Sequence, residues 1–200
     1  MRLFAAIRPP VQVLDHLERA LSGVAALADA GGVRWAAQEN LHLTLAFFGE
    51  VPDGAVGELA EELADVAGAT SSFAMRLRGA GVFGQRTVWV GAGGEVESFV
   101  GLAARARAAG EGLSRFRDER ARQRPHLTIG RVGPARAGRD RRAATLPVEV
   151  EHLVHALSVY EGPSWTVSEI ALESSVPGAG RGGGPRYETV HRMPLAAVAG

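Results

Sequence analysis

The segment NLHLTLAFFGE, residues 40–50, decides the interpretation of this chain, because a close copy of its centre, RPHLTIGRVG, returns at residues 124–133. Each copy carries His-Leu-Thr and then an apolar residue, with the two histidines at positions 42 and 126. One such segment alone favours a half-buried strand whose imidazole bonds to a backbone carbonyl. Two copies in corresponding parts of the chain indicate a shared role.

Side-chain alternation predicts what the first copy presents. Successive side chains of a strand point to opposite faces of the sheet. His42 and Thr44 therefore share one face, while Leu41, Leu43 and Leu45 share the other. We expect the leucines to enter the core and to hold the two polar side chains rigidly.

The second copy repeats this design. His126 and Thr128 share one face, and Leu127 and Ile129 form the buried set. If the two halves of the chain pack around a pseudo-twofold axis, the two strands lie side by side and both His-Thr pairs face one cleft. Four polar side chains then converge on a volume suited to a small ligand.

Composition limits the classes of protein to consider. The chain has 200 residues, 46% of them hydrophobic, which is enough for one domain with a substantial core. Basic and acidic residues each number 22, so no overall field favours nucleic acid or an anionic membrane, and any anion site must be local. Cysteine is absent, which excludes disulfides, thiolate nucleophiles and cysteine-based metal sites.

The opening segment MRLFAAIRPP, residues 1–10, predicts a cytoplasmic protein. Its apolar run is interrupted at Arg8 and Pro9. Such a run is too short for the apolar region of a signal peptide or for a membrane span.

Apolar periodicity predicts alternating strands and helices in an α+β fold. Besides the two histidine segments, we expect strands at residues 2–7, 33–35, 73–79, 86–93, 165–172 and 186–195. We expect helices from Pro10 to Gly31, at 55–67, around 99–106 and at 150–157, the last closed by Gly162 and Pro163. Residues 134–142 and the glycine-rich residues 177–185 are expected to be loops. Two similar halves, each with one histidine segment, suggest a duplicated unit.

Two imidazoles and two hydroxyls suit acid–base chemistry at phosphorus. Histidine has an ordinary pKa of about 6.5, so one copy can be neutral and the other protonated at working pH. In-line displacement at phosphorus uses a base to deprotonate the attacking oxygen and an acid to protonate the leaving oxygen. Threonine hydroxyls can donate to the non-bridging oxygens. The spacing alone leaves open which histidine is the acid.

The segments ENLHLTL…FFGE and RPHLTIGR resemble the paired HxTx motifs of the two-histidine (2H) phosphoesterases, and within them the bacterial and archaeal RNA 2′,3′-cyclic phosphodiesterase family (ThpR, also called LigT). The likeness extends to MRLFAAI, VRWAAQENLHLTL and WTVSEIALESS…RYETV, so it covers most of the chain. It implies one domain, residues 1–200, with a two-lobed pseudo-symmetric α+β fold. Each lobe would be an antiparallel sheet with flanking helices, and the active-site cleft would lie between the lobes.

The same resemblance implies a reaction and residue roles. The reaction is hydrolysis of a 2′,3′-cyclic phosphate to a 2′-phosphomonoester without a metal or another cofactor. His42 would protonate the departing 3′ oxygen and His126 would activate water, with Thr44 and Thr128 binding the phosphate. The expected partner is RNA with a 2′,3′-cyclic phosphate end or a small cyclic nucleotide, and we expect a monomer that does not contact membranes.

Two further residues are predicted to bind substrate. Members of the family often have a basic residue after the first motif, where this chain has Ala46, whereas Arg131 after the second motif matches the pattern. Strict alternation puts Arg131 on the apolar side of its strand, so a surface role is as consistent with the sequence as phosphate binding. Tyr187 follows the glycine-rich loop and is the aromatic residue we favour for stacking on a base. Most of the tryptophans (Trp35, Trp89 and Trp165) are expected to be core.

The remaining histidines are predicted to lie on solvated surfaces. His152 and His155 are three apart on an expected helix, yet no third ligand of recognisable pattern accompanies them, so a solvated face is favoured over a metal site. His16 and His191 are isolated. The loop GAGRGGGP lacks the Gly-Lys-Ser/Thr ending of a P-loop.

Three alternatives to this hydrolase stay open. The protein could be a non-catalytic RNA or nucleotide binder that uses the same cleft. It could join RNA through a 2′–5′ bond, the ligase activity for which the resembled family was first noticed. The repeat could also be structural, with both imidazoles buried in separate cores.

Overall fold

A computed structural model gives the fold and describes residues 1–113, 124–133, 145–180 and 184–197. The strands are β1 (Arg2–Ile7), β2 (Val33–Trp35), β3 (Leu43–Glu50), β4 (Phe73–Phe83), β5 (Thr87–Gly94), β6 (His126–Val132), β7 (Glu161–Val167), β8 (Glu169–Val176) and β9 (Arg186–Pro194). The helices are α1 (Val11–Ser22), α2 (Ala25–Ala30), α3 (Val56–Gly68), α4 (Val96–Ala109) and α5 (Val148–Leu157), with short 3-10 turns η1 (Gln38–Asn40) and η2 (Asp53–Ala55).

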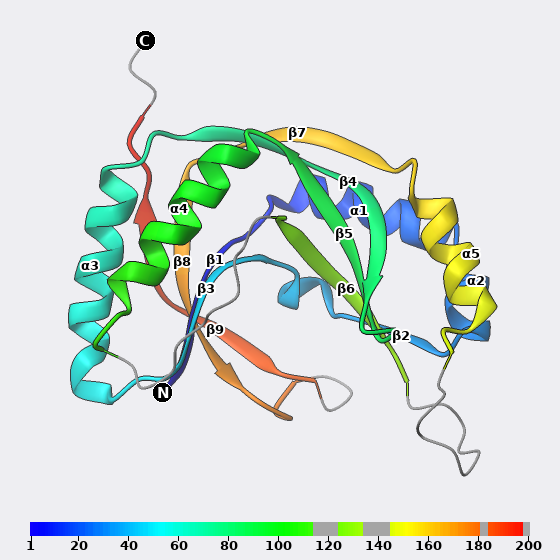
Figure 1. Cartoon of the computed structure of the whole chain (residues 1–200), viewed down its shortest axis with the longest axis horizontal. Helices are drawn as coiled ribbons and strands as arrows, with labels where there is room; N and C mark the ends of the chain where they lie inside the picture. Colours follow the sequence, from blue (N-terminus) through cyan, green and yellow to red (C-terminus); the bar gives the residue numbers. More distant parts are fainter. Residues whose placement is uncertain (114–123, 134–144, 181–183, 198–200) are drawn as a thin grey trace.

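The described strands form one curled antiparallel sheet (Figure 1). Its order is β7-β4-β5-β6-β3-β1-β8-β9, and β2 pairs with β6 off this path. The two strands that carry the histidine motifs, β3 and β6, are therefore the central neighbours. Both motifs meet in the middle of the sheet.

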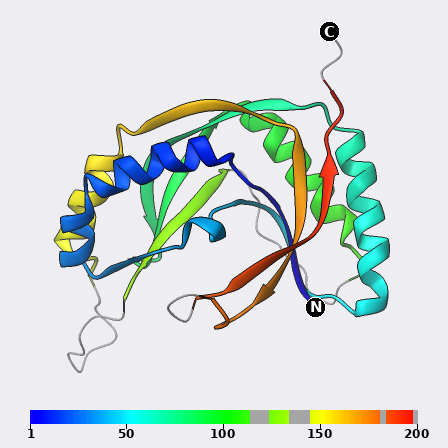
Figure 2. The same ribbon diagram turned by 180° about the vertical axis from the view of Figure 1, so that it is seen from behind.

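We define two lobes by the strands on either side of the β3–β6 junction. The first lobe contains β2, β4, β5, β6 and β7, with α1, α2 and α5 packed against it, and the second contains β1, β3, β8 and β9, covered by α3 and α4. Figures 1 and 2 show these two groups of helices at opposite ends of the molecule. The prediction of a two-lobed α+β fold with antiparallel strands and flanking helices is confirmed.

The chain does not complete one lobe before it enters the other; it passes between them several times. β1 lies in the second lobe, α1, α2 and β2 in the first, β3 and α3 in the second, and β4 and β5 in the first. After α4 covers the second lobe, β6, α5 and β7 return to the first, and β8 and β9 complete the second. The expectation of two sequential halves is therefore wrong, because each lobe is assembled from strands distant in sequence.

The motif strands are fixed by the side chains on their apolar face. Leu43, Leu45, Leu127 and Ile129 are fully buried, as alternation predicts, and belong to one contiguous cluster that draws on both lobes. Full burial of a leucine or isoleucine side chain contributes roughly 1.5–3 kcal/mol. The backbone that carries the histidines is thus held firmly in place.

Several predicted boundaries differ from the structure. The expected helix from Pro10 to Gly31 is two helices, and the expected strand at 165–172 is divided at Ser168 into β7 and β8. Gly162 and Pro163 lie inside β7 instead of closing α5. Proline lacks a backbone N–H but is tolerated there because β7 is an edge strand.

Of the two predicted loops, the structure describes only part of the glycine-rich one. Residues 134–142 lie outside the described residues, as do 181–183 within the glycine-rich segment. None of the helices in the described ranges has the combined length and apolar character needed to cross a membrane.

Candidate active site

The two motif strands meet where Leu43 of β3 and Leu127 of β6 are register partners in an antiparallel pair. Because the strands run in opposite directions, the histidine of each motif lies toward the threonine of the other. The motif side chains emerge on the side of the sheet opposite to these leucines, which we call the motif face. All four are partly buried: His42, Thr44, His126 and Thr128.

The two histidine rings are oriented in the same way. His42 Nδ1 bonds to the carbonyl oxygen of Asn40 at 2.8 Å, and His126 Nδ1 bonds to that of Arg124 at 3.1 Å, in each case two residues before the histidine. A carbonyl oxygen only accepts, so Nδ1 of each ring carries a proton and donates it. Nε2 is then the nitrogen through which each ring can exchange a proton with a substrate.

Burial lowers the pKa of His42 from 6.5 to about 4. The hydrogen bond to Asn40 opposes this shift, and the positive charge of Arg8 adds to it. Glu173 raises the pKa of His42 and the charge of His126 lowers it, so the two histidines lie within electrostatic reach of one another. His42 is therefore neutral at pH 7 in the free protein.

The threonine hydroxyls lie on the same face as the rings. Within the described residues neither Thr44 nor Thr128 forms a side-chain hydrogen bond. Both are therefore able to donate to a ligand placed between the histidines. A phosphate group, with several acceptor oxygens, has the chemistry to use two such donors.

A β-bulge changes the position of Arg131. One step along β5, from Val88 to Trp89, corresponds to two steps along β6, from Gly130 to Thr128. The extra residue shifts the alternation beyond it. Arg131 therefore returns to the motif face, where it is exposed. The expectation that it lies on the apolar side is wrong because that expectation assumed a regular strand.

A second bulge follows the first motif. One step along β1 corresponds to two steps along β3, from Thr44 to Ala46. Phe47 thereby occupies the place that Arg131 has in the second motif. The guanidinium of Arg2 lies over the Phe47 ring, 5.0 Å from its centroid. A cation is thus present on this side as well, although it comes from β1 and was not predicted.

Two aromatic rings enclose His42. The ring centroids of Phe4 and Tyr187 lie 4.8 and 5.2 Å from that of His42, and 5.0 Å from one another. Burial raises the pKa of Tyr187, and the charge of Arg131 and of two other arginines opposes this shift. Tyr187 comes from β9 of the second lobe and Arg131 from β6 of the first, so the structure brings both predicted substrate-binding residues toward the same region.

Two aromatic rings also accompany His126. Phe83 contacts it edge to face at a centroid distance of 4.9 Å, and Trp89 lies 6.3 Å away. Phe83 and Trp89 stack on each other at 5.0 Å with an angle of 26° between their planes. Trp89 is on the motif face because its register partner is Thr128. Phe83 was not predicted, because its one signal in the sequence is its place at the end of a strand before Gly84.

An ion pair between the partly exposed Arg8 and the buried Glu173 lies near His42. Arg8 donates to both carboxylate oxygens of Glu173, at 2.7 and 3.0 Å, and to the carbonyl oxygen of Glu39 at 2.6 Å. Thr189 donates to the same carboxylate at 3.0 Å. Glu173 is fully buried, so its charge depends on these partners. Through its bond to Glu39, Arg8 also holds η1 in place. The next residue of η1, Asn40, supplies the carbonyl oxygen that orients the His42 ring.

The other histidines lie apart from this site. His152, His155 and His191 are exposed, as predicted, and His16 Nδ1 lies 3.1 Å from the Tyr160 hydroxyl. In the ranges that the structure describes, no group of three potential metal-binding side chains lies together. Trp165 is 8% exposed and belongs to the core.

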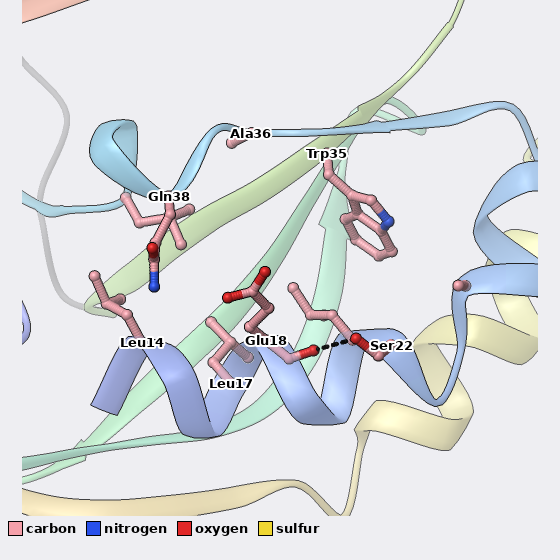
Figure 3. Close-up of a pocket in the computed structure, with 10 residues that line it drawn as sticks. Leu14, Leu17, Glu18, Ser22, Trp35, Ala36 and Gln38 are labelled. Atoms are coloured by element: carbon pink, nitrogen blue, oxygen red, sulfur yellow. Dashed lines mark hydrogen bonds between the residues drawn. The ribbon is translucent and has the colours of Figure 1, made fainter. Parts of the chain in front are cut away.

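A cavity of about 290 Å³ lies between α1 and the segment that leads from β2 to β3 (Figure 3). Its lining is mainly apolar, and Trp35 and Glu18 are its aromatic and its charged member. Neither motif histidine lines it. We therefore do not assign the motif chemistry to this cavity.

Known proteins are similar to this chain in sequence and in architecture. The sequence pattern of LigT-like phosphoesterases matches residues 7–89. An RNA 2′,3′-cyclic phosphodiesterase of Methanothermobacter thermautotrophicus is 34% identical over 88% of this chain and 90% of its own length. One of Geobacillus stearothermophilus is 30% identical over 80% of this chain, and the match covers 47% of that longer protein. The crystal structure of Escherichia coli LigT complexed with 3′-AMP matches with a TM-score of 0.66 and 26% identity over 98% of both chains.

A curled antiparallel sheet with paired His-Leu-Thr strands at its centre places the protein in the class of phosphoesterases. The chain belongs to the LigT-like phosphoesterase family. This confirms the resemblance found in the two motifs.

Proposed function

We propose that this protein hydrolyses 2′,3′-cyclic phosphates at RNA ends, or in small nucleotides, to 2′-phosphomonoesters. The observation that carries the proposal is the pairing of the two motif strands. It puts both histidines on one face, with Nδ1 of each ring bonded to the carbonyl two residues before it. Two imidazoles with matched orientation suit a reaction that needs one proton taken and one given.

The proposed reaction is an in-line displacement. A water oxygen attacks phosphorus while Nε2 of His126 takes one water proton, and the bond from phosphorus to the 3′ oxygen breaks. Nε2 of His42 gives its proton to that oxygen, so the product carries a 3′ hydroxyl and a 2′-phosphate. Proton exchange with solvent restores both rings. This assignment of donor and acceptor comes from the family resemblance.

A neutral His42 must gain a proton before it can serve as the donor. The substrate itself can promote this protonation, because a phosphate anion beside an imidazole favours the charged ring. We therefore propose that the pKa of His42 rises from about 4 when the cyclic phosphate binds. The burial that depresses the pKa in the free protein also strengthens this electrostatic attraction.

Four other residues are proposed to bind the substrate. Thr44 and Thr128 would donate to the non-bridging oxygens, and Arg131 would offset the charge that develops there. Tyr187, from the second lobe, would contact the substrate and exclude water from the His42 side. The bulge in β6 supports the role of Arg131, since it turns that side chain toward the motif face.

The known relatives support the substrate class. The curated relatives reported above are named RNA 2′,3′-cyclic phosphodiesterases, and the E. coli structure contains 3′-AMP, a ribonucleotide with a phosphate on the ribose. The reaction requires no metal in this proposal. Action in the cytoplasm, as a monomer and as one domain, stays a prediction.

One assay tests the proposal. Purified protein is incubated with adenosine 2′,3′-cyclic phosphate in excess chelator, and the product is identified by phosphorus NMR. We expect the 2′-phosphate, at a rate that the chelator does not change. An intact ligand would indicate a binding protein, loss of turnover in chelator would indicate a metalloenzyme, and the 3′-phosphate would reverse the regiochemistry. Supplying RNA with a 5′ hydroxyl in addition would reveal a 2′–5′ ligase by a longer product.

A further inference from the structure

The paired rings of Phe83 and Trp89 form a surface beside His126 that the reaction itself does not use. Phe83 ends β4 and Trp89 lies on β5. Trp89 points to the motif face because its register partner is Thr128. Phe83 points to the same face because it lies two residues beyond Gly81, the register partner of Trp89. The Phe83 and His126 rings meet edge to face, with 4.9 Å between their centroids. The pair therefore borders the position proposed for the phosphate.

Glycines make room for this pair. A Cβ atom at Gly81 would overlap the indole ring of Trp89, so the ring lies directly against the backbone of β4. At Gly91, the register partner of His126, a Cβ atom would lie 2.9 Å from the Arg78 carbonyl oxygen and 3.4 Å from Cζ3 of Trp89. The indole is thus fixed on a strand surface cleared of side chains, and Phe83 is stacked on a rigid support.

Phe83 is 45% exposed although it is a large apolar side chain. Its ring stacks on Trp89 at an angle of 26°, so the exposed side of the aromatic pair is a flat ring. The His42 side differs. There Phe4 is 3% exposed, and Tyr187 meets both neighbouring rings edge to face. The rings near His42 pack against one another, whereas the pair near His126 offers a face.

We propose that the Phe83–Trp89 pair is the subsite for the nucleobase of the nucleotide that carries the cyclic phosphate, with the base stacked on Phe83. The proposal rests on the proposed function, since it assumes a ribonucleotide ligand. Every nucleobase has a flat π face and stacks on aromatic rings, largely independently of its hydrogen-bonding pattern. The subsite therefore recognises a base without selecting strongly among the four. Seated next to His126, it orients the ribose and holds the phosphate between the two histidines.

The test distinguishes the contribution of the base to substrate binding from that of the phosphate. Turnover of adenosine 2′,3′-cyclic phosphate is compared with that of methyl ribofuranoside 2′,3′-cyclic phosphate, which has the same reacting group and no base. Phe83→Leu keeps the apolar volume and removes the ring. It should raise KM for the nucleotide about 5- to 150-fold, the range expected for loss of one base stack, and leave KM for the base-free substrate unchanged. Phe83→Trp should retain the preference for the nucleotide.

Two further variants serve as controls for Phe83→Leu. Val159→Ala, at a position 86% exposed after α5, should change neither substrate's constants. Tyr187→Leu on the opposite side should alter both substrates by the same factor. Equal losses on both substrates in Phe83→Leu would show a structural role for the ring. A loss confined to the nucleotide in Tyr187→Leu would move the base to the other lobe. Either result overturns the proposal.

A binding measurement keeps this test independent of turnover. Calorimetry with 3′-AMP and with ribose 3-phosphate gives the contribution of the base even if the wild-type protein hydrolyses neither cyclic substrate. Phe83→Leu should weaken 3′-AMP about 5- to 150-fold and leave ribose 3-phosphate unchanged. Absence of turnover with this binding pattern would reject the proposed reaction and support the base subsite. Equal binding of both ligands by the wild-type protein would reject the subsite.

Discussion

Leu43 and Leu127 are register partners, and among the described residues this pair joins the two motif strands at the centre of the sheet. Each leucine lies between the histidine and the threonine of its motif and is fully buried. The pair therefore sets the separation of the two histidine–threonine sets from the apolar side.

The first prediction concerns the two histidines. His42→Ala and His126→Ala should each lower kcat by at least about 100-fold, the lower end of what a positioned acid or base contributes. The loss in the double variant should be smaller than the product of the single losses, because the two rings serve one proton relay. Steady-state kinetics on a 2′,3′-cyclic nucleotide measures this.

The exposed histidines of α5 provide the control. His155→Ala should retain wild-type kcat and KM, since that side chain lies on the solvent side of the helix. Near-normal turnover in either motif variant would exclude the paired mechanism.

The second prediction concerns the titration of His42. Because burial lowers its pKa to about 4, its ring should stay neutral with the proton on Nδ1 down to about pH 5 in the free protein. Nitrogen–proton correlation spectra of the histidine rings report both the tautomer and the midpoint. A midpoint near 6.5 would contradict the burial described above.

Protein stability should respond to the same group. The folded-state pKa of His42, about 4, is below the value of 6.5 expected when unfolded, so the unfolded chain binds more protons between these values. The free energy of unfolding should therefore fall as the pH decreases from 6.5 to 4, by at most about 1.4 kcal/mol per pH unit from this group. Urea denaturation of His42→Gln should show a shallower pH dependence over this window than the wild type.

The third prediction separates the acid from the base. If His42 is the donor, kcat/KM should decline as the pH rises above about 4, whereas kcat should hold to a higher pH because the bound phosphate raises the pKa. If His42 were the acceptor, kcat/KM would instead increase with pH through the same midpoint. The direction of this limb decides between the two assignments.

The fourth prediction concerns Arg131. If its guanidinium donates to the phosphate, Arg131→Ala should raise KM about 10- to 150-fold, since hydrogen bonds to charged groups contribute about 1.5–3 kcal/mol. Arg131→Lys should restore only part of this, because lysine lacks the two-pronged geometry. Arg192→Ala, on β9 and paired with Glu169, is a matched exposed arginine and should leave KM unchanged. Equal KM for Arg131→Ala and the wild type would assign Arg131 to the surface.

The fifth prediction concerns the ion pair of Arg8 and Glu173. Arg8→Ala leaves the carboxylate of Glu173 buried without its cation, which should lower the free energy of unfolding by about 3–5 kcal/mol. Arg8→Met combined with Glu173→Leu should recover most of this stability. Denaturant titrations of the single and double variants measure the coupling. If η1 orients His42 through Arg8, the stable double variant should still show a reduced kcat.

The motif strands were predictable because their information is local. Alternation within five residues places His42 and Thr44 opposite the buried leucines, and the structure agrees. The position of Arg131 was not predictable in this way, since a bulge arises from the pairing of β6 with β5. Gly130 was the available signal, because an isolated glycine in a strand often marks a bulge. A Cβ atom there would lie 2.9 Å from the Arg34 carbonyl oxygen.

Long-range pairing limited the prediction of the lobes and of the site's surroundings. Periodicity shows that β1 and β8 are strands, but their pairing spans most of the chain and leaves no local pattern. The same applies to Phe4 and Tyr187, which reach His42 from β1 and β9, and to Phe83 beside His126. Residues contributed by neighbouring strands require the topology, whereas residues within a motif do not.

The passage of the chain between lobes has a consequence for synthesis on the ribosome. β1 is translated long before β8, although the two strands are neighbours in the sheet. A nascent chain that has both histidines still lacks β8 and β9, and therefore Glu173 and Tyr187. The second lobe can therefore close only after β8 and β9 have been synthesised, and until then β1 has an open edge on the side that β8 later covers.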